Sequence, residues 1–385
     1  MTAAGLVDVA VVGAGVIGSS IAHHLQIQQT TTIAFDSIEP ARRAHHSASA
    51  NSGGIIRAVH SRPEETMLTI ASSRAYRHID ATLGGAVSYT EAGFAFITDH
   101  SHRRAVLDRI ALMRSLDYPA ELLDAMQLGR RWPEISWRTN DIALFEPASG
   151  SIDVSGALTA FQHSLIAHGG EVTPETVTGF APAADGHWVV TTDDENEYHA
   201  TTVVIAAGPH TTELLRTTRH HELPATPTRL GVVEIASEHS RGGIPHGLSF
   251  IDDITGGYAI SRPEITYLGA NGRVSPTDSQ STLTDGEQDA IRDTVNIRLP
   301  ALHAAPTAGT RVGTDATTSD GRPLIEQLEP NLFVCSGFSG GGAKIAPEIG
   351  RLTAQWVLTG ARPELLSRYA HSQDDAHATP VFSYL

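Results

Sequence analysis

The sequence has one cysteine, one lysine and no long apolar run. The single cysteine, Cys335, excludes a disulfide within the chain, and no Cys/His spacing suits a structural zinc site, so no metal is expected. No stretch reaches the ~18 apolar residues of a membrane span. The apolar start at 7–17 lacks the basic region and the cleavage site of a signal peptide. A soluble, cytoplasmic protein without membrane insertion is therefore expected.

Basic residues are scarce as a class. The 385 residues include 27 basic and 43 acidic ones, a net charge of −16, which disfavours nucleic acids and anionic membranes as partners. Hydrophobic residues make up 41% and charged residues 18%, as in globular proteins, and the length predicts two domains. Lys344 is the only lysine. Codon composition explains most of that bias, but the location of this one lysine is of interest.

The N-terminus carries a nucleotide-binding pattern. A buried strand is predicted at 7–12 and a helix at 19–28. Between them lie Gly13, Gly15 and Gly18, with the spacing Gly-x-Gly-x-x-Gly. These glycines permit a tight turn, a close approach of the backbone to a pyrophosphate, and close packing of helix on strand. The N-terminus of the helix offers N–H groups to the anion.

A second strand at 30–35 ends on Asp36, 18 residues after Gly18. An acid at this place accepts a hydrogen bond from a ribose 2′-hydroxyl, so the βαβ unit predicts dinucleotide binding. Arg42 and Arg43 would suit a 2′-phosphate, but Asp36 opposes one, which disfavours NADP. This motif alone does not distinguish FAD from NAD.

The rest of the chain alternates between helices and strands, without an internal repeat. Helices are expected at 63–83, 103–116, 151–168 and 345–358. Strands are expected at 86–98, 171–177, 188–192, 203–208 and 331–336, and the segment 226–304 is expected to be mainly β.

A glycine-rich turn lies near the C-terminus. The stretch 337–341 matches Gly-x-Ser-x-Gly between a strand and a helix, which would make Ser339 the nucleophile of a serine hydrolase. A triad acid and a histidine would then have to follow on further strands. Only one helix and a tail with Asp374, Asp375 and His377 remain, so this interpretation is disfavoured. The other interpretation is a close approach of glycine backbone to a flat cofactor.

Four segments, in order along the chain, resemble one family. They are 11–18, 49–57, 203–208 and 318–347, and they resemble the FAD-dependent D-amino-acid oxidase superfamily. The similarity is greatest to its branch of sarcosine oxidases and N-methyl-amino-acid oxidases or dehydrogenases. The resemblance spans nearly the whole chain, and Gly-Phe-Ser-Gly-x-Gly-x-Lys at 337–344 is its most specific part.

The resemblance implies an α/β fold of two domains and FAD, rather than NAD, as the cofactor. A discontinuous, Rossmann-like FAD-binding domain of the GR2 type would comprise 1–85, 146–225 and 305–370. A second, β-rich domain with an antiparallel sheet would bind the substrate, and a C-terminal tail would follow it. These two parts would comprise 86–145 with 226–304, and 371–385.

The implied FAD contacts come from all four segments. The ADP half would be held by Gly13, Gly15, Gly18 and Asp36, and the pyrophosphate and ribityl by Ser49, Asn51 and Gly53. The glycine-rich turn would run along the pyrimidine edge of the flavin. The remaining contacts would come from Gly208, Gly337, Gly340, Gly341, Gly342 and Lys344.

The resemblance also implies a substrate site. Arg57 and Lys344 would clamp a substrate carboxylate, one as a fork of donors and the other as a point charge, with Tyr258 lining the pocket. The alternatives are a structural ion pair for Arg57, a solvated charge for Lys344 and an ordinary strand aromatic for Tyr258. His60 and His210 flank the motif segments and are further candidates.

The implied reaction is oxidation of the C–N bond of an amino acid, or of a carboxylated secondary or cyclic amine. The product would be an imine, formed by hydride transfer to flavin N5. A D-amino-acid or glycine oxidase or dehydrogenase of the same superfamily is the main alternative. A serine hydrolase using Ser339, an NAD-dependent dehydrogenase and a non-enzymatic flavin-binding subunit stay as further alternatives.

Two positions depart from the family pattern. Several of its oxidases attach the flavin through a cysteine near the position of Gly313, so FAD is expected to be non-covalent here. Sarcosine-type oxidases also carry a lysine that promotes reaction with O2, at the position of Tyr267. O2 and another electron acceptor are therefore both open, with Arg262 or Arg273 as a substitute cation.

Overall fold

The chain folds into two compact units, each assembled from separate segments. The computed structural model describes residues 5–37, 47–82, 85–219, 221–236, 247–262, 264–271 and 282–370. The first unit comprises the described residues of Met1–Ser52, Val154–Thr228 and Gly313–Val381, and the second comprises those of Gly53–Asp153 and Arg229–Val312. Within these described ranges, no helix is long and apolar enough to cross a lipid bilayer.

The first unit is built on a sheet of eight strands in the order β17-β18-β11-β1-β2-β8, with β10 and β9 attached to β11. The strands β18, β11, β1, β2 and β8 are parallel, and their buried residues make near-continuous apolar runs, as sheets covered on both faces require. The strands are β1 (Val7–Val12), β2 (Thr32–Phe35), β8 (Glu171–Thr173), β9 (Val177–Pro182), β10 (Trp188–Thr192), β11 (Glu197–Ile205), β17 (Leu324–Glu329) and β18 (Leu332–Ser336).

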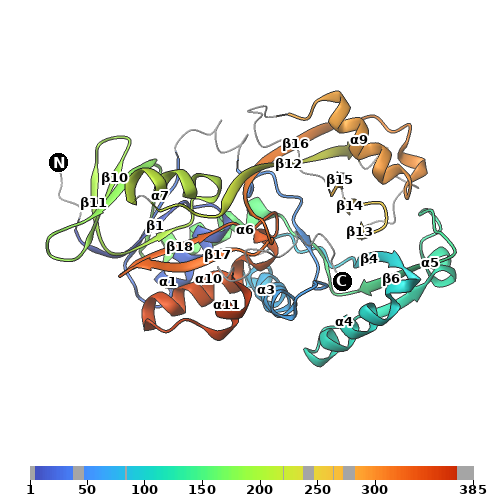
Figure 1. Cartoon of the computed structure of the whole chain (residues 1–385), viewed down its shortest axis with the longest axis horizontal. Helices are drawn as coiled ribbons and strands as arrows, with labels where there is room; N and C mark the ends of the chain where they lie inside the picture. Colours follow the sequence, from blue (N-terminus) through green and yellow to red (C-terminus); the bar gives the residue numbers. More distant parts are fainter. Residues whose placement is uncertain are drawn as a thin grey trace. The chain divides into compact units, whose positions relative to one another are not determined.

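Helix α1 (Val16–Gln26) is central to this unit, because it packs against both α6 (Val154–Ala167) and α10 (Gly342–Thr359) (Figure 1). The contact with α10 is close. The Ser20 hydroxyl donates to the Ala346 carbonyl over 2.9 Å, and a Cβ at Gly350 would overlap the Ser20 side chain. The unit is completed by η2 (Gly208–His210), α7 (Thr211–Arg219) and α11 (Glu364–Tyr369).

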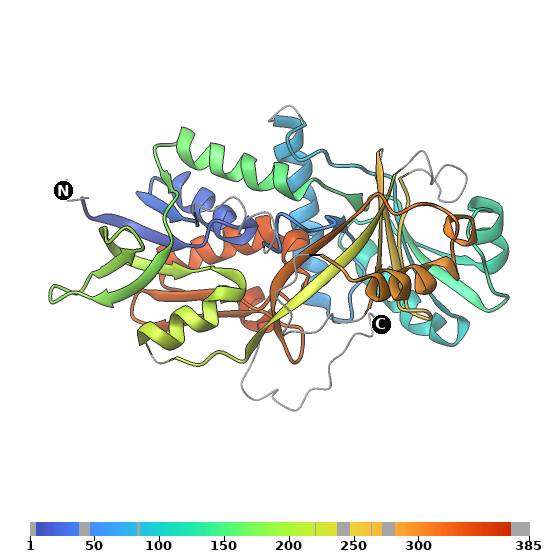
Figure 2. The ribbon, with the colours of Figure 1, turned by 90° about the horizontal axis from the view of Figure 1, so that it is seen from above.

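The second unit holds another eight-stranded sheet, in the order β16-β12-β15-β14-β13-β4-β6-β5. The pairs from β12 to β13 and from β4 to β5 are antiparallel, and β13 pairs with β4 in parallel. The long neighbouring strands β12 and β16 are drawn in yellow and orange in Figure 2. The strands are β4 (Phe94–Asp99), β5 (Glu121–Asp124), β6 (Asp141–Glu146), β12 (Ala225–Ala236), β13 (Ser249–Asp252), β14 (Gly257–Ser261), β15 (Ile265–Ala270) and β16 (Gly309–Thr318).

Helices and a short strand pair complete the second unit. Strand β3 (Ile55–Ile56) pairs with β7 (Gly150–Ser151) in a separate two-stranded sheet. The helical segments are α3 (Pro63–Thr82), η1 (His100–His102), α4 (Arg103–Ser115), α5 (Ala125–Arg131), α9 (Asp285–Asn296) and η3 (Pro300–Leu302). The predicted α/β fold class, with a second unit rich in β-strands, is confirmed.

Helix α9 corrects the prediction that 226–304 is mainly β. The helix begins with a capping box, in which the Thr284 hydroxyl accepts from the Glu287 N–H and the Glu287 carboxylate accepts from the Thr284 N–H. Its buried side, with Ile291 and Val295 four residues apart, has the spacing of an amphipathic helix. The expected strand at 86–98 is shorter than predicted, since β4 begins at Phe94.

The compact units differ from the expected domains in the segments 53–85, 146–153 and 305–312, which belong to the second unit. Hydrogen bonds explain the difference at 53–85. Strand β3 pairs with β7, and the backbone N–H groups of Ala58 and Val59 donate to Glu146 at the end of β6. These bonds hold the segment after Gly53 to the second sheet. The expected tail at 371–385 lies outside the described residues.

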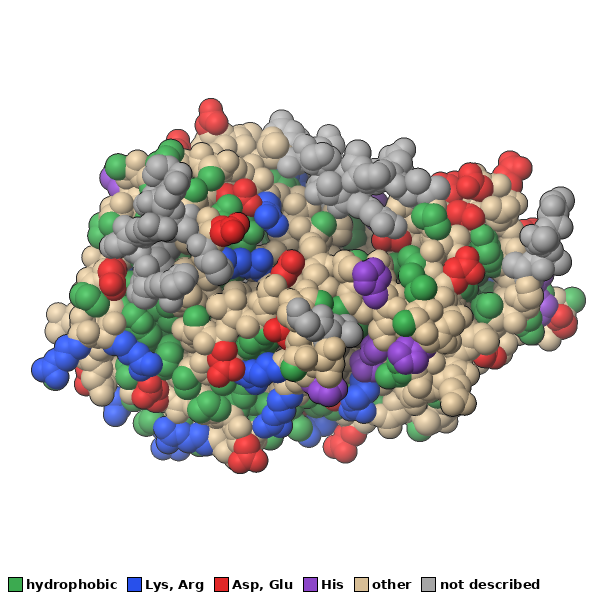
Figure 3. Space-filling model, turned by 180° about the vertical axis from the view of Figure 1, so that it is seen from behind, with side chains coloured by type: hydrophobic (Ala, Val, Ile, Leu, Met, Phe, Trp, Pro, Cys, Tyr) green, Lys and Arg blue, Asp and Glu red, His purple; other side chains and the backbone are tan. Residues whose placement is uncertain are grey.

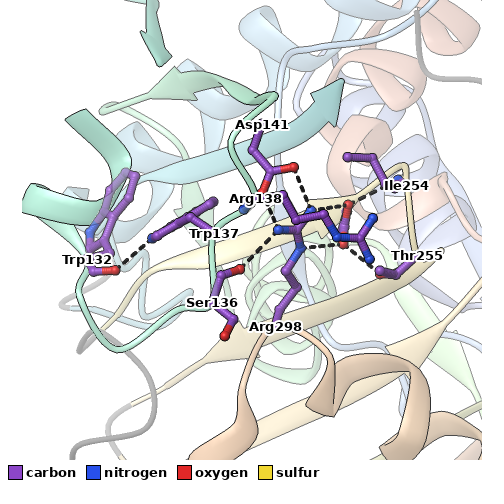
Figure 4. Close-up of polar contacts among 9 residues, drawn as sticks. Trp132, Ser136, Trp137, Arg138, Asp141, Ile254, Thr255 and Arg298 are labelled. Atoms are coloured by element: carbon purple, nitrogen blue, oxygen red, sulfur yellow. Dashed lines mark hydrogen bonds and ion pairs between the residues drawn. The ribbon is translucent and has the colours of Figure 1, made fainter. Parts of the chain in front are cut away.

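A buried ion cluster holds three parts of the second unit together (Figure 4). Arg298, just after α9, donates to Asp252 of β13 over 2.6 Å and forms two hydrogen bonds with Asp141 of β6. The side chains of these three residues are at most 1% exposed. The Ser136 carbonyl accepts a further bond from the guanidinium over 3.0 Å. Each charge is therefore paired, as burial in an apolar interior requires.

We expect Arg298→Met to lower the free energy of unfolding by about 3–5 kcal/mol, because two carboxylates would stay buried without their cation. Urea denaturation followed by circular dichroism measures the change. Arg104→Met is the control, since its pair with Asp108 is exposed, and its effect should stay below about 1 kcal/mol. Equal effects of the two substitutions would contradict the importance of the buried cluster.

Candidate active site

At the first glycine turn, which follows β1, neighbouring backbone segments pack directly against one another. Gly13 has φ 98°, and a Cβ there would lie 2.5 Å from the Ala206 carbonyl oxygen. A Cβ at Gly18 would overlap the Gly13 carbonyl oxygen. Gly15 is the N-cap of α1 and brings no side chain to the start of the helix. Larger residues at Gly13 and Gly18 would thus displace backbone, whereas a Cβ at Gly15 would lie 3.3 Å from the Ser49 hydroxyl oxygen.

The turn at 47–52 lies against this glycine turn. The Ser49 hydroxyl accepts from the Val16 N–H over 3.1 Å, at the first residue of α1. The Asn51 amide donates to the Ser47 carbonyl over 3.0 Å, which closes the turn. On its other side, a Cβ at Gly313 of β16 would lie 3.1 Å from the Asn51 Cβ. Ser49 therefore lies beside the start of α1, and Asn51 lies in the same turn, next to β16.

Asp36 lies directly after β2, at the same edge of the sheet. The Gly13 N–H donates to the Phe35 carbonyl over 2.9 Å, so the ends of β1 and β2 are tied together. The Asp36 carboxylate accepts from the Ser37 N–H over 3.0 Å. Gly208 follows the neighbouring strand β11 with φ 56°, and the space where its Cβ would lie is open. His210, two residues on, is exposed.

The glycine-rich turn joins β18 to α10, and three of its residues have positive φ: Gly337 at 75°, Ser339 at 53° and Gly340 at 83°. The Ser339 hydroxyl accepts from the Thr318 N–H over 3.1 Å and donates to the Gly337 carbonyl over 3.2 Å. Within the described part of the chain, the hydrogen bonds of this hydroxyl are with Thr318 and Gly337, and neither is a histidine. Ser339 therefore holds the turn in shape, and none of the described residues acts on its hydroxyl as a general base.

Lys344 lies in the first turn of α10 and is only 7% exposed, which excludes a solvated surface charge. Its side chain runs back toward the start of the helix, because a Cβ at Gly341 would lie 2.6 Å from the Lys344 Nζ. Gly341 is the N-cap, so the ammonium lies beside a helix end that no side chain caps. A cation there opposes the helix dipole and requires a compensating charge.

Asp315 of β16 supplies such a charge and is the site residue that the sequence analysis missed. Its carboxylate accepts from the Gly340 N–H over 2.6 Å and from the Ala316 N–H over 2.8 Å. Burial raises the pKa of Asp315, while these hydrogen bonds and the charge of Lys344 act in the opposite direction. The available signal was a single acid in a strand of mostly small residues that leads into the family segment 318–347.

Arg57 follows β3 in the second unit and is 6% exposed. Its guanidinium donates to the Val59 carbonyl and lies 3.1 Å from Nδ1 of His60. The His60 ring is also buried, with Nδ1 2.9 Å from the Glu65 carboxylate. The guanidinium is therefore held by the loop that carries it, and His60 contacts Arg57 directly.

Glu146 anchors the backbone of this loop. It is fully buried, and its two oxygens accept from the N–H groups of Ala58 and Val59 over 2.7 and 2.8 Å. The Ser149 hydroxyl donates to the same carboxylate. Burial raises the pKa of Glu146, and the hydrogen bonds together with the charge of Arg57 oppose the rise. Glu146 thus fixes the backbone immediately after Arg57.

Tyr258, on β14, is half-buried in the same unit. Its ring covers Gly269, its partner on β15, where a Cβ would overlap the ring. It packs against the apolar cluster that includes Ala58 and Val59. The structure therefore brings Tyr258 to the loop of Arg57, whereas Lys344 belongs to the first unit.

Tyr267, at the position expected for the oxygen-promoting lysine, is 2% exposed and has two guanidinium groups near its ring. The Cζ atoms of Arg262 and Arg311 are 5.4 and 5.0 Å from the centre of its ring. Arg262 also donates to the Gly53 carbonyl over 2.8 Å and to the Ile152 carbonyl. Of the two substitute cations, Arg262 thus contacts a predicted cofactor residue, and Arg273 lies outside the described residues.

The first unit suits a dinucleotide. Two helices, α1 and α10, begin at glycine N-caps that bring no side chain of their own to the helix start, and the first N–H of α1 donates to the Ser49 hydroxyl. Such helix ends bind phosphate and other anions through N–H groups and the helix dipole. Gly208 leaves an open backbone position after β11, and Asp36 follows the last residue of β2.

Comparison with known proteins agrees with this geometry. A family model described as FAD dependent oxidoreductase matches residues 8–356. The monomeric sarcosine oxidase of Streptomyces avermitilis is 25% identical over 373 residues, which cover 92% of this chain and 94% of that protein. The N-methyl-L-tryptophan oxidase of Yersinia pestis is 25% identical over 384 residues, covering 94% and 98%.

Two solved structures share the fold. The L-proline dehydrogenase from P. horikoshii superposes with a TM-score of 0.85 at 20% identity, covering 95% of this chain and 97% of the other. The glycine oxidase from Bacillus cereus does so with a TM-score of 0.78 at 20% identity, covering 95% and 99%.

We expect Glu146→Gln to lower the free energy of unfolding by about 1–3 kcal/mol, because the amide NH2 would face a backbone N–H donor. Hydrogen exchange of the Ala58 and Val59 amides should become faster, as the loop of Arg57 loses an anchor. Glu213→Gln is the control, since Glu213 is exposed in a surface pair with Arg216. Unchanged exchange at both amides would contradict the role of Glu146.

Proposed function

The chain belongs to the family of FAD-dependent oxidoreductases, and from this premise we propose that it oxidises the C–N bond of an amino acid or of a carboxylated secondary or cyclic amine to an imine. The predicted family and FAD dependence are confirmed by the match. A serine hydrolase and an NAD-dependent dehydrogenase do not fit this family. The observation that carries the proposal is the buried Lys344 in the glycine-rich turn, where similar oxidases bind the substrate carboxylate.

The names of the relatives support a small amino acid or N-methyl amino acid as the substrate class. A sarcosine oxidase and an N-methyl-L-tryptophan oxidase align over nearly the whole chain, and the fold is shared with a proline dehydrogenase and a glycine oxidase. A D-amino-acid or glycine oxidase or dehydrogenase is the alternative within the family. All these substrates carry a carboxylate and an amine nitrogen, and the reaction oxidises a carbon that is bonded to this nitrogen.

The cofactor would be held by residues of both glycine turns and of the turn at 47–52. We assign the ADP half to the first turn with Asp36, the pyrophosphate and ribityl to Ser49, Asn51 and Gly53, and the pyrimidine edge to the second turn. Bound FAD supplies the acceptor for the two electrons and the hydrogen that leave the substrate carbon. Gly208 adds an open backbone position at the end of β11.

The chain's own residues bind and orient the substrate. Lys344 offers a point charge and Arg57 a fork of donors to the carboxylate, and both are buried, where a charge-assisted hydrogen bond is strong. Tyr258 lines the side of the pocket near the Arg57 loop. Orientation of the reacting carbon is the main contribution expected of these contacts. We assign no general acid or base.

We propose that FAD is bound without a covalent link. Gly313 occupies the position at which similar oxidases carry the linking cysteine, and a side chain there would press on the turn at 47–52. The only cysteine, Cys335, is buried in β18, and burial raises the pKa of its thiol to about 12. A thiol with such a pKa stays protonated and is a poor nucleophile.

We also propose that the electrons pass to O2 or to another acceptor, with Arg262 as the cation that would replace the lysine of the sarcosine-type oxidases. Acidic and basic side chains are interspersed on the face shown in Figure 3, which suits a small-molecule substrate better than a nucleic acid. A cytoplasmic location fits such an enzyme.

The purified protein should be yellow, with the absorption bands of oxidised flavin, and acid precipitation should release free FAD. An anaerobic panel of D-, L-, N-methyl and cyclic amino acids should contain compounds that bleach the flavin, because they reduce it. Admission of air then distinguishes an oxidase, which recolours at once, from a dehydrogenase. Flavin that stays with the precipitate would contradict the non-covalent link, and a panel without bleaching would contradict the proposed reaction.

Replacing Lys344 with Met should weaken the binding of carboxylate inhibitors roughly ten- to hundredfold, because a charge-assisted hydrogen bond is lost. The FAD content should stay the same. Arg351→Met is the matched control, as Arg351 lies in the same helix but pairs with Glu348 at the surface. Titration of each protein with the inhibitor, followed by the flavin absorbance, measures the dissociation constant of the inhibitor for the wild type and for each variant. Equal inhibitor affinity in wild type and Lys344→Met would refute the role of Lys344.

A further inference from the structure

The strongest unassigned feature of the site is the buried acid Asp315. It is 9% exposed, lies in the part of β16 after Val312, which belongs to the first unit, and is outside the four segments of the family resemblance. A buried carboxylate is costly unless its charge is compensated, so its position requires an explanation. Three groups act on it: two backbone N–H donors and the ammonium of Lys344.

The geometry places Asp315 and Lys344 on the same short stretch of backbone. The Gly340 N–H donates to the carboxylate over 2.6 Å. At the next residue, a Cβ on Gly341 would lie 2.6 Å from the Lys344 Nζ. The acid and the ammonium therefore both lie at the start of α10, although β16 and α10 are separate in sequence. Both are within the first unit, so this arrangement is internal to it.

A compensated lysine attracts a ligand differently from an isolated one. An isolated ammonium in a low-dielectric site acts on a carboxylate as a full charge. When a carboxylate lies beside it, the ligand instead experiences a dipole, whose attraction falls off faster with distance. The two N–H donors favour the ionised form of Asp315 and so maintain this dipole.

We propose that Asp315 is a specificity-determining residue, which compensates the charge of Lys344 and lets the site accept amino-acid amides nearly as well as the free acids. The proposal rests on the proposed function, since it concerns the carboxylate that Lys344 would bind. Asp315 acts through Lys344 and touches no reacting atom, so it is a positioning residue. The expected ligands are thus carboxylated amines and their neutral acyl derivatives.

Two other roles for Asp315 predict different results. If Asp315 only holds the glycine-rich turn in shape, its replacement should weaken the binding of acids and of amides to the same extent. If it instead accepts a hydrogen bond from the ammonium of the substrate, its replacement should again weaken both. Only charge compensation predicts tighter binding of the acid, because removal of Asp315 leaves Lys344 with its full charge.

The experiment compares the amino acid that bleaches the flavin fastest in the anaerobic panel with its own primary amide. The concentration dependence of bleaching gives an apparent dissociation constant for each, in holoenzyme with FAD bound. In the wild type, the two constants should agree within about tenfold. In Asp315→Asn, the constant of the acid should fall about tenfold while that of the amide stays within about twofold.

The double variant Asp315→Asn with Lys344→Met completes the cycle. The gain for the acid should disappear there, because Asp315 acts through Lys344. An unchanged ratio of acid to amide in Asp315→Asn, or weaker binding of both, would overturn the proposal. If Asp315→Asn does not fold, the dissociation constants of the wild type test the proposal by themselves. A wild type that binds the acid more than about a hundredfold more tightly than the amide would overturn the proposal. A panel in which no amino acid bleaches the flavin would refute the proposed reaction itself.

Discussion

The first unit depends on the close approach of backbone to backbone at the carboxyl ends of its parallel strands. Gly13 and Gly18 leave no space between the turn after β1, the start of α1 and the end of β11 at Ala206. Only residues without a Cβ allow this, and the result is an edge made of N–H and carbonyl groups. That edge can meet a large flat cofactor without intervening side chains, and the positions of Ser49 and Asp36 follow from it.

The second glycine turn determines where the buried cation Lys344 lies. Gly337, Ser339 and Gly340 take positive φ, which places the start of α10 beside β16 and buries Lys344 at an uncapped helix end. Burial of a lone cation there is unfavourable on two grounds, desolvation and the helix dipole. Asp315 offsets both the desolvation and the unfavourable dipole, because its carboxylate binds the backbone of the turn and its charge acts on Lys344.

Sequence alone predicts features that are encoded locally. The spacing of Gly13, Gly15 and Gly18 after an apolar strand is enough to place the nucleotide turn, and the family resemblance places Lys344. Contacts between distant residues are not predictable in this way. Ala58 and Val59 meet Glu146 across 88 and 87 residues, and Asp315 meets Gly340 across 25, and no local pattern marks these pairs. Helix α9 was missed for another reason, since its signal is a capping box within a segment of strands.

The two buried acids, Glu146 and Asp315, have the same physical role in different units. Each accepts hydrogen bonds from two backbone N–H groups, and each lies next to a cation that the proposed reaction needs, Arg57 or Lys344. A long cationic side chain is flexible, so binding a small carboxylate with it requires that its backbone be held still. A buried carboxylate holds the backbone through its hydrogen bonds, and its negative charge also weakens the electric field of the cation. Under the proposed function, the strength of carboxylate binding would therefore depend on Glu146 and Asp315 as well as on Arg57 and Lys344.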